Sequence, residues 1–366
     1  MLDLLLIIFL GPIGLIIVIF RHLHKTQKPI SPSQNPNWYL SLSLNREDAF
    51  SQLFLLLSLI SFGVTLTAFN RNFANPLSWH TIVLITSIIG FVSTYYYKTI
   101  YTLILSLLSI LIWWKYQIYL WIEPTKISPA AFLTGLSFVA LIFFILGLLH
   151  TKQIRYKRFS LIYQLLGIII FTAMLFFLSI QAGLHIFEET TQGKSLLTSW
   201  QLTISMLILL ITLISTTLYA TINKLINTSE IIIVAIIASL FTLILFLPEQ
   251  TIFIKRSYTY YSSTSGNLSP AGIAWAITFN VILFLELLGL LFSGYLRRET
   301  WLINLGSVFL VFFVIIKYFD WFFTFLNKSV FFISAGILLF IIGWFMEKAR
   351  KIMFQNIQNS PPVPTL

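Results

Sequence analysis

Only one acidic residue of this sequence lies deep inside a long apolar segment. Glu286 stands within ITFNVILFLELLGLLFSG, residues 277–294. If the segment is a helix, Glu286 lies about 22 Å from Ala271 and about 16 Å from Arg297 along the axis. An ionisable side chain at the centre of a membrane helix costs about 2.5–3.5 kcal/mol on insertion scales, so it is a functional candidate by default.

Two interpretations of Glu286 remain open. As a functional group it would be a proton or cation site between neighbouring helices. As a structural group it would be a protonated carboxyl hydrogen-bonded to another helix. Gly289 and Ser293 follow on the same helical stripe, where small residues let helices pack closely. Asn280 is a second intramembrane polar candidate, and its rotation of about 240° from Glu286 predicts that it faces elsewhere.

A second constellation is the segment KYFDWFF at residues 317–323, just after an apolar segment. Lys317 and Asp320 are three residues apart, a spacing that lets them pair on a helix. The aromatic residues around them are typical of a membrane interface. We therefore expect a helix end that carries a surface ion pair.

The remaining residues give no catalytic, metal or cofactor signature. A haem between helices needs two axial ligands at matching depth, but the histidines lie in loops or near the expected helix ends: His22, His24, His80, His150 and His185. Two of them, His80 and His185, could share a metal on the outside, although lone histidines are more often plain polar groups. The sequence has no cysteine, no Walker A loop, no G-x-S-x-G elbow and no H-E-x-x-H motif. We therefore predict neither enzyme activity nor a bound metal or cofactor.

The composition places these residues in a membrane. Of the 366 residues, 58% are hydrophobic and only 10% are charged, whereas a soluble domain carries about 25% charged residues. Most of the exterior must therefore face lipid, which excludes a soluble enzyme or a disordered scaffold. The net charge of +11 lies in short basic clusters at the ends of apolar segments. There it orients the chain and contacts anionic headgroups, so we predict no nucleic-acid partner.

A membrane core of about 30 Å needs roughly 20 apolar residues in helical form. On this measure we predict an all-α, polytopic transmembrane helical bundle of about eleven spans. The third and fourth spans are the weakest assignments, because only Lys98 separates them and the fourth is short. The predicted spans are Leu2–Phe20, Ala49–Phe69, Thr81–Tyr97, Thr99–Trp114, Pro129–Leu149, Ser160–Phe187, Ser199–Ile222, Ile231–Leu247, Ala271–Leu296, Trp301–Ile316 and Ser329–Phe345.

The Lys and Arg residues predict the orientation. Fifteen fall in one set of alternate loops and eight in the other, and the richer side is expected to be cytoplasmic. This places the N-terminus outside and the C-terminus in the cytoplasm. We expect residues 1–20 to form an uncleaved signal-anchor-like span, because a basic cluster follows it and no cleavage site is visible. Residues 21–48 read as a flexible cytoplasmic linker, 49–351 as a membrane bundle of about ten helices, and 352–366 as a disordered cytoplasmic tail.

Three short motifs near the C-terminus resemble a known family. They are KYFD at 317–320, SVFF at 329–332 and the final apolar segment that ends at Glu347. The pattern is similar to the end of a bacterial membrane-protein family, domain of unknown function 2157, and RYKRFSLIYQLLG (155–167) resembles its middle segment. Lys317 replaces the family's Arg, which loses bidentate geometry, and an extra span and linker replace the family's soluble N-terminal segment. The resemblance implies a bacterial inner-membrane protein but no particular activity.

From these observations we expect a non-catalytic scaffold or assembly subunit of a membrane complex in the bacterial cytoplasmic membrane. The motivation is that deep polar groups are nearly absent while aromatic residues are abundant, with 35 Phe, 15 Tyr and 10 Trp. The expected partners are a bilayer with anionic headgroups and other membrane proteins. The alternative is a secondary transporter or channel that uses Glu286 as an intramembrane proton or cation site.

Overall fold

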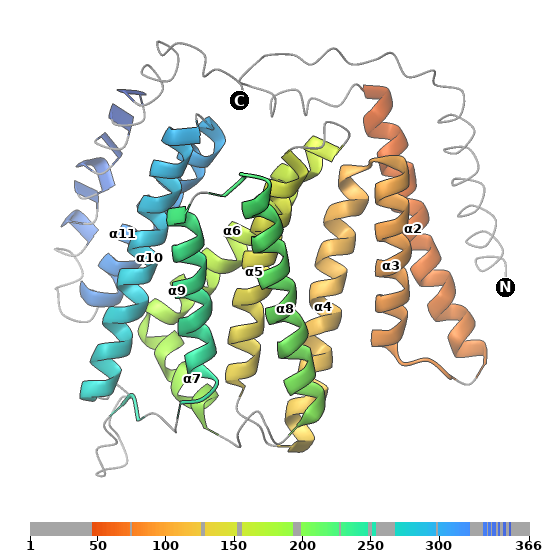
Figure 1. The fold of residues 1–366 in the computed structure, drawn as a ribbon, viewed down its shortest axis with the longest axis horizontal. Coiled ribbons are helices and arrows are strands. Elements are labelled where there is room, and N and C mark those ends of the chain that lie inside the picture. The colour runs from red at the N-terminus through yellow and green to blue at the C-terminus, as the bar shows by residue number, and fades with distance from the viewer. Residues whose placement is uncertain are drawn as a thin grey trace. The chain divides into compact units, whose positions relative to one another are not determined.

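The regular structure of the chain is helical. This computed structural model describes residues 46–73, 75–125, 129–151, 156–192, 199–226, 228–247, 251–253, 268–297 and 299–322, with part of 332–352. Within these ranges the strand-type pairing is limited to one isolated bridge, between Phe253 and Leu268. The helices (Figure 1) are α2 Arg46–Asn72, α3 Trp79–Tyr97, α4 Ile100–Thr125, α5 Ala130–Thr151, α6 Lys157–Ser179, α7 Gln181–Thr191, α8 Trp200–Ile222, α9 Thr228–Ile244, α10 Pro270–Arg297 and α11 Thr300–Phe322.

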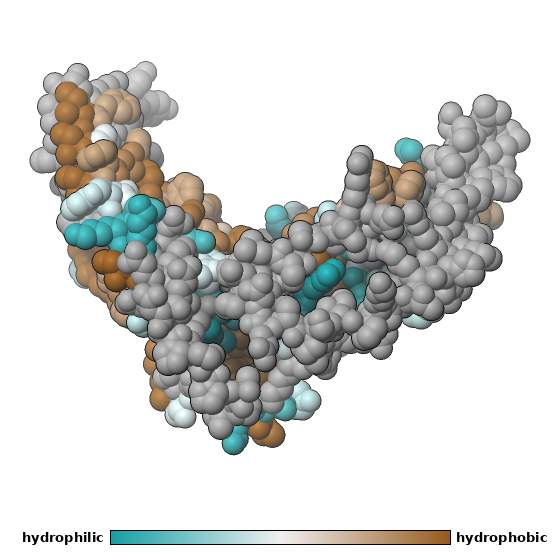
Figure 2. All heavy atoms as spheres, turned by 90° about the horizontal axis from the view of Figure 1, so that it is seen from above, coloured by the Kyte–Doolittle hydropathy of each residue, from teal (hydrophilic) through white to brown (hydrophobic). Residues whose placement is uncertain are grey.

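The helices support the assignment of a membrane protein. Eight of them in the described part of the chain are long and apolar enough to cross a membrane, namely α2 to α6, α8, α10 and α11. Two shorter apolar helices, α9 and one within 332–341, complete the set. The count of eleven and the orientation stay predictions, because Leu2–Phe20 and nearly all of 21–48 and 352–366 lie outside the described residues. Figure 2 shows hydrophobic residues, in brown, over broad areas of the described surface.

The chain divides into two compact units. One comprises Met1–Ile169 and Gly193–Phe246, and the other comprises Ile170–Gln192 and Leu247–Leu366. We call them unit 1 and unit 2. Unit 1 therefore holds α2 to α5, the first part of α6, α8 and α9, and unit 2 holds the last part of α6, α7, α10 and α11.

Helix α5 is the core of unit 1. In its apolar stretch 72% of the residues are buried, against 17% for α8. Ile145 is fully buried in a cluster with Phe138 and Leu213, and Thr134 Oγ1 donates a 2.7 Å hydrogen bond to the carbonyl of Phe241 in α9. The all-round apolar sequence of α5 explains this position, because a helix that is hydrophobic on every side is buried on every side.

Two residues, Lys98 and Thr99, join α3 to α4. Lys98 adopts the left-handed conformation (φ 57°, ψ 42°) and caps α3, and the amide of Ile100 at the start of α4 donates to Gln52 Oε1 in α2 at 3.1 Å. Thr94 and Thr102 join the two helices by a 2.9 Å hydroxyl hydrogen bond. The third and fourth predicted spans are therefore separate helices, and α4 extends well past the predicted end at Trp114. Figure 1 shows α2, α3 and α4 side by side.

Small residues allow α5 and α6 to approach closely. A Cβ on Gly167 would stand 2.6 Å from the carbonyl oxygen of Ala140 and 2.8 Å from the amide nitrogen of Phe144. Both atoms belong to the backbone of α5, so they cannot swing aside as a side chain can. Gly289 of α10, in contrast, has no atom within 4 Å of the equivalent position.

We predict that Gly167→Ala destabilises the protein by about 1–3 kcal/mol, because α5 and α6 must separate to admit the methyl group. The matched control Gly289→Ala should leave stability unchanged or raise it slightly, since alanine favours the helix. Thermal unfolding of both variants in mild detergent measures the difference. Equal melting temperatures for the two variants would contradict the close contact.

Candidate functional site

The candidate site lies in unit 2, where a helix breaks inside an apolar segment. The expectation of one continuous span over Ser160–Phe187 is wrong, because α6 ends at Ser179, Ile180 is extended (φ −100°, ψ 161°) and α7 begins at Gln181. A break of this kind leaves carbonyl groups on one side and amide groups on the other without helical partners. In a membrane these groups must be satisfied by the protein itself.

Two side chains satisfy the carbonyl at the end of α6. The oxygen of Ser179 accepts a hydrogen bond from Lys317 Nζ of α11 and a 3.3 Å hydrogen bond from Asn280 Nδ2 of α10. An ammonium group here is favourable for a second reason, because the C-terminal end of a helix carries partial negative charge. Lys317 thus acts as a C-terminal cap that comes from a different helix.

The partner of Lys317 caps the other side of the break. Asp320 Oδ1 accepts from the amide of Gln181 at 3.4 Å, so a negative group lies at the N-terminal end of α7, where the helix dipole favours it. Lys317 Nζ lies 3.8 Å from Asp320 Oδ2, and their side chains are only 7% and 18% exposed. The expected pair forms in the last turns of α11, but it is largely buried instead of lying on the surface. The pair is buried, α11 continues to Phe322, and the two charges hold the two ends of a broken helix.

The register of the α10–α11 hairpin brings the two donors together. Gly294 of α10 packs on Ile303 of α11, and Phe284 lies 6.2 Å from Phe313 between ring centres. The same antiparallel spacing sets Asn280 opposite Lys317. Each lies about 26 Å along its helix from the turn that joins α10 to α11. If that turn stands at one membrane surface, the break lies near the opposite edge of a hydrocarbon core of about 30 Å.

Glu286 lies deeper on α10 and is only half satisfied. Thr172 Oγ1 of α6 donates a 2.7 Å hydrogen bond to Glu286 Oε1. The other oxygen, Oε2, is buried and has no hydrogen-bond partner among the described residues. A buried polar atom without a partner is uncommon and calls for an explanation. Because a carboxylate is expensive to keep in a membrane, a proton or a small cation on this oxygen would offset the cost.

Asn280 and Glu286 both contact α6, so the expectation that Asn280 faces elsewhere is wrong. Their partners Ser179 and Thr172 are seven residues apart, about two helical turns, and share one face of α6. Asn280 Nδ2 also donates to Ala276 O at 2.7 Å, while Asn280 Oδ1 is buried without a partner. Within the described part of unit 2, the buried side-chain atoms that lack a partner are this oxygen and Glu286 Oε2.

The close contacts of α10 do not involve Gly289 and Ser293, the two small residues that were predicted to allow close packing. Gly289 is exposed, with open space where a Cβ would stand, and Ser293 is half-buried. The glycines that do pack in this hairpin are Gly294, against Ile303, and Gly306, against Leu290 and Leu291.

Helix α7 is anchored beside the break. Any Cβ on Gly183 would overlap the carbonyl of Phe177 in α6, so only glycine allows this approach. Phe187 is fully buried and packs edge-on against Trp275 and Phe279 of α10, with ring centres 5.0 and 5.1 Å away. These contacts give α7 a fixed place on α10, although it is too short to span a membrane.

In the described residues, His80 and His185 make packing and hydrogen-bond contacts. His185 stacks on Phe253 at 3.7 Å, and His80 lies 2.9 Å from Ser78 Oγ. No group of three His, Cys, Asp or Glu side chains there could hold a metal ion.

Unit 1 contains a polar network that the sequence did not reveal. Tyr95 Oη lies 2.9 Å from Tyr163 Oη and 3.1 Å from His150 Nε2, and His150 Nδ1 lies 2.7 Å from the carbonyl of Leu146. The network joins α3, α5 and α6. These residues are far apart in the chain, and each alone is an ordinary polar residue near the end of an apolar segment.

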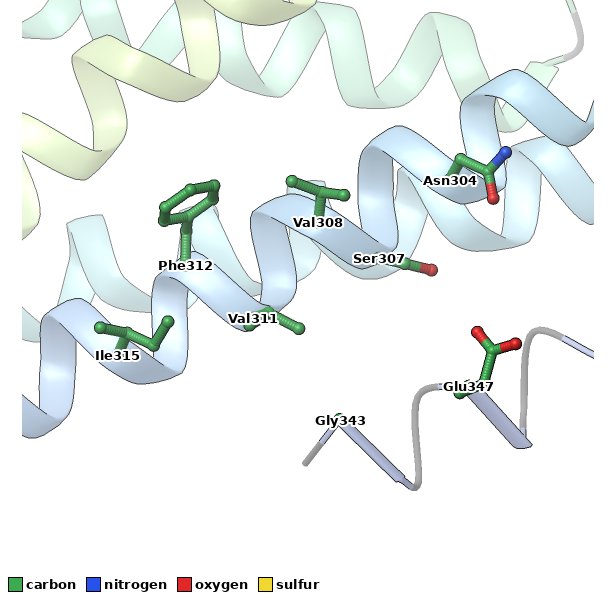
Figure 3. Close-up of a pocket in the computed structure, with 8 residues that line it drawn as sticks. All are labelled: Asn304, Ser307, Val308, Val311, Phe312, Ile315, Gly343 and Glu347. Carbon is green, nitrogen blue, oxygen red and sulfur yellow. The ribbon is translucent and has the colours of Figure 1, made fainter. Parts of the chain in front are cut away.

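A separate groove lies beside α11 in unit 2. Its volume is about 390 Å³, and among its described lining residues Glu347 is the one with an ionisable side chain. Figure 3 shows this carboxyl facing the part of α11 that carries Ser307 and Asn304, away from the apolar end with Ile315.

Comparisons of the chain with protein-family models, curated proteins and solved structures found no match. The resemblance to domain of unknown function 2157 therefore stays a prediction.

We predict that Lys317→Met lowers stability by about 3–5 kcal/mol, because it leaves Asp320 buried without its counter-charge and removes a donor from Ser179. The matched control is Lys351→Met, which breaks an exposed ion pair with Glu347 (3.7 Å) and should cost at most about 1 kcal/mol. Thermal unfolding in mild detergent compares the two variants. Equal losses would show that the buried pair has no special role.

Proposed function

We propose that this chain is a secondary transporter or channel in which Glu286 is an intramembrane proton or cation site. The observation that carries the proposal is the buried Oε2 atom of Glu286, which has no hydrogen-bond partner among the described residues. Thr172 fixes the other oxygen at 2.7 Å, so the carboxyl is held in one orientation with an open acceptor position.

The surroundings of Glu286 favour transport over a purely structural role. The scaffold hypothesis rested on the near-absence of deep polar groups, yet Lys317 and Asp320 are largely buried in the same unit. Transporters commonly contain broken helices whose ends meet charged groups; the α6–α7 break shares the charged groups at both helix ends, but it lies near one edge of the membrane core and not at its midplane. The second unpartnered oxygen, Asn280 Oδ1, lies about 9 Å from Glu286 along α10 towards the break, which marks a direction for an ion to follow.

The proposed chemical step is simple. Glu286 carboxylate takes up a proton to form the neutral carboxyl, or binds a cation through Oε2, and releases it on the other side. Either event removes the cost of a lone charge in the hydrocarbon. No bond other than that to the proton or cation forms or breaks, and no enzyme activity is proposed.

The membrane location and orientation of the protein are inferred from its sequence. We place the protein in the bacterial cytoplasmic membrane with about eleven spans, the N-terminus outside and the C-terminus in the cytoplasm. The 15-to-8 distribution of Lys and Arg between alternate loops supports this orientation.

We predict that Glu286→Gln abolishes proton flux into proteoliposomes. Glutamine can still accept a hydrogen bond from Thr172, so folding should be kept while the titratable group is lost. Flux is measured with an entrapped pH-sensitive dye under an imposed potassium diffusion potential. Glu123→Gln, which changes an exposed acid at the end of α4, is the matched control and should conduct like the wild type. Wild-type vesicles no faster than empty ones, or a Glu286→Gln variant as fast as wild type, would refute proton transport through Glu286.

A second candidate function is the scaffold or assembly subunit. The observation that favours it is the uncovered apolar face of α8, of whose apolar stretch only 17% is buried. The exposed residues along this face include Trp200, Ile204, Leu207, Ile211, Ile214 and Leu218. Either lipid or the helices of partner proteins would cover such a surface.

The scaffold candidate predicts that the protein leaves the membrane in a larger particle. Gentle detergent extraction followed by native electrophoresis should then show a band well above the mass of one chain, with other membrane proteins in fixed proportion. A strictly monomeric chain would count against it.

A further inference from the structure

A groove in unit 1 separates α2 from the α3–α4 hairpin. Its volume is about 650 Å³, and its walls are mainly apolar: Leu59, Ile60, Val64, Ile82, Val83 and Leu105. Ser109 and two threonines also line it; of the threonines, Thr67 Oγ1 donates to Gly63 O at 2.8 Å and Thr86 Oγ1 donates to Ile82 O at 2.9 Å. Because these hydroxyl hydrogens are used within their own helices, the groove suits a hydrocarbon chain.

One end of the groove carries a positive charge. Arg71 lies in the last turn of α2, lines the groove together with Asn72, and is exposed. The turn that follows is fixed by Asn70, whose amide donates to Leu77 O at 2.7 Å and whose oxygen accepts from Leu77 N at 2.9 Å. The backbone that carries Arg71 is therefore held at this end of the groove.

Aromatic residues mark this end of the groove as the headgroup level. Trp79 at the start of α3 lies 4.3 Å from Tyr116 of α4 between ring centres, and His80 lies 5.4 Å from the same ring. Amphipathic rings of this kind gather where the membrane meets water. Arg71 is thus placed where the phosphate of a lipid would lie.

The length of the groove fits one lipid leaflet. From Leu59 to Asn72 the wall formed by α2 is about 20 Å long, which is about two-thirds of a hydrocarbon core of about 30 Å and covers one leaflet and its headgroup edge. A spanning helix of a partner protein would need the full thickness. The length of the groove and the positive charge of Arg71 at its end together favour a lipid with a negative headgroup.

We propose that this groove is a binding site for an anionic phospholipid, with an acyl chain between α2 and α3–α4 and the phosphate on Arg71. The guanidinium group suits this role because it can donate two parallel hydrogen bonds to a phosphate. The proposal is independent of the function assigned to Glu286, which lies in the other unit.

The test uses the full chain, delipidated in mild detergent and titrated with phosphatidylglycerol or phosphatidylcholine, with retained lipid counted by native mass spectrometry. Wild-type protein should retain phosphatidylglycerol in preference to phosphatidylcholine, and Arg71→Gln should weaken phosphatidylglycerol binding about tenfold. The matched control is Lys115→Gln, an exposed cation of α4 beside Tyr116 that does not line the groove; it should bind as the wild type does.

A second variant tests the acyl-chain part of the site. A Cβ on Gly63 would stand 3.4 Å from Thr86, so Gly63→Leu should fill the groove and lower the binding of both lipids several-fold. The melting temperature of each variant in detergent checks its folding. If Gly63→Leu unfolds, the test depends on Arg71→Gln, which changes an exposed residue. The proposal is overturned if Arg71→Gln binds like the wild type, if Lys115→Gln loses as much, if the wild type does not distinguish the two lipids, or if a folded Gly63→Leu retains both.

Discussion

The break between α6 and α7 leaves backbone carbonyl and amide groups without helical partners near one edge of the membrane core, and the protein supplies hydrogen bonds to both kinds of group. Side chains from the neighbouring α10–α11 hairpin form hydrogen bonds with these groups. Lys317 and Asn280 donate to the carbonyl of Ser179, and Asp320 accepts from the amide of Gln181. The positions of α7, α10 and α11 depend on this arrangement, because each of these helices supplies one side of it.

The same cluster explains how two charges are kept in an apolar setting. A buried ion pair alone is a doubtful source of stability, since removing two charges from water costs as much as their attraction returns. Here each charge also meets a helix end of opposite sign and a backbone hydrogen bond. Glu286 lacks such compensation, because its one partner in the described residues is a neutral hydroxyl and one of its oxygens has none. In unit 2, therefore, the Lys317–Asp320 pair has a structural role, whereas Glu286 has an oxygen that can still bind a proton or a cation.

Much of the fold could be predicted from the sequence. Long apolar segments located the described spanning helices to within a few residues for α3, α5 and α8, and the single acid in an apolar segment marked Glu286. The break at Ile180 could not be predicted, because Ser179, Ile180 and Gln181 carry no proline or glycine and the local pattern stays apolar. The only local sign was Gly183, whose need for close contact with Phe177 becomes visible in three dimensions.

The arrangement of the site residues could not be predicted from the sequence either, because it depends on how the helices pack. Helical rotation placed Asn280 and Glu286 on different faces of α10, yet both side chains reach partners on α6. The pairing of Thr172 with Glu286 joins residues more than a hundred positions apart, so no local spacing predicts it. The Lys317–Asp320 spacing did predict a pair, but burial and the role at the helix break depend on the register of the α10–α11 hairpin.

The most direct test of this account is amide hydrogen exchange across α7 in the wild type and in Lys317→Met. If the charged pair holds the broken helix, exchange over residues 181–191 should become at least several-fold faster in the variant, while exchange in α8 stays unchanged. Equal exchange over α7 in the two proteins would contradict the account, because the break would then be held by contacts other than this pair.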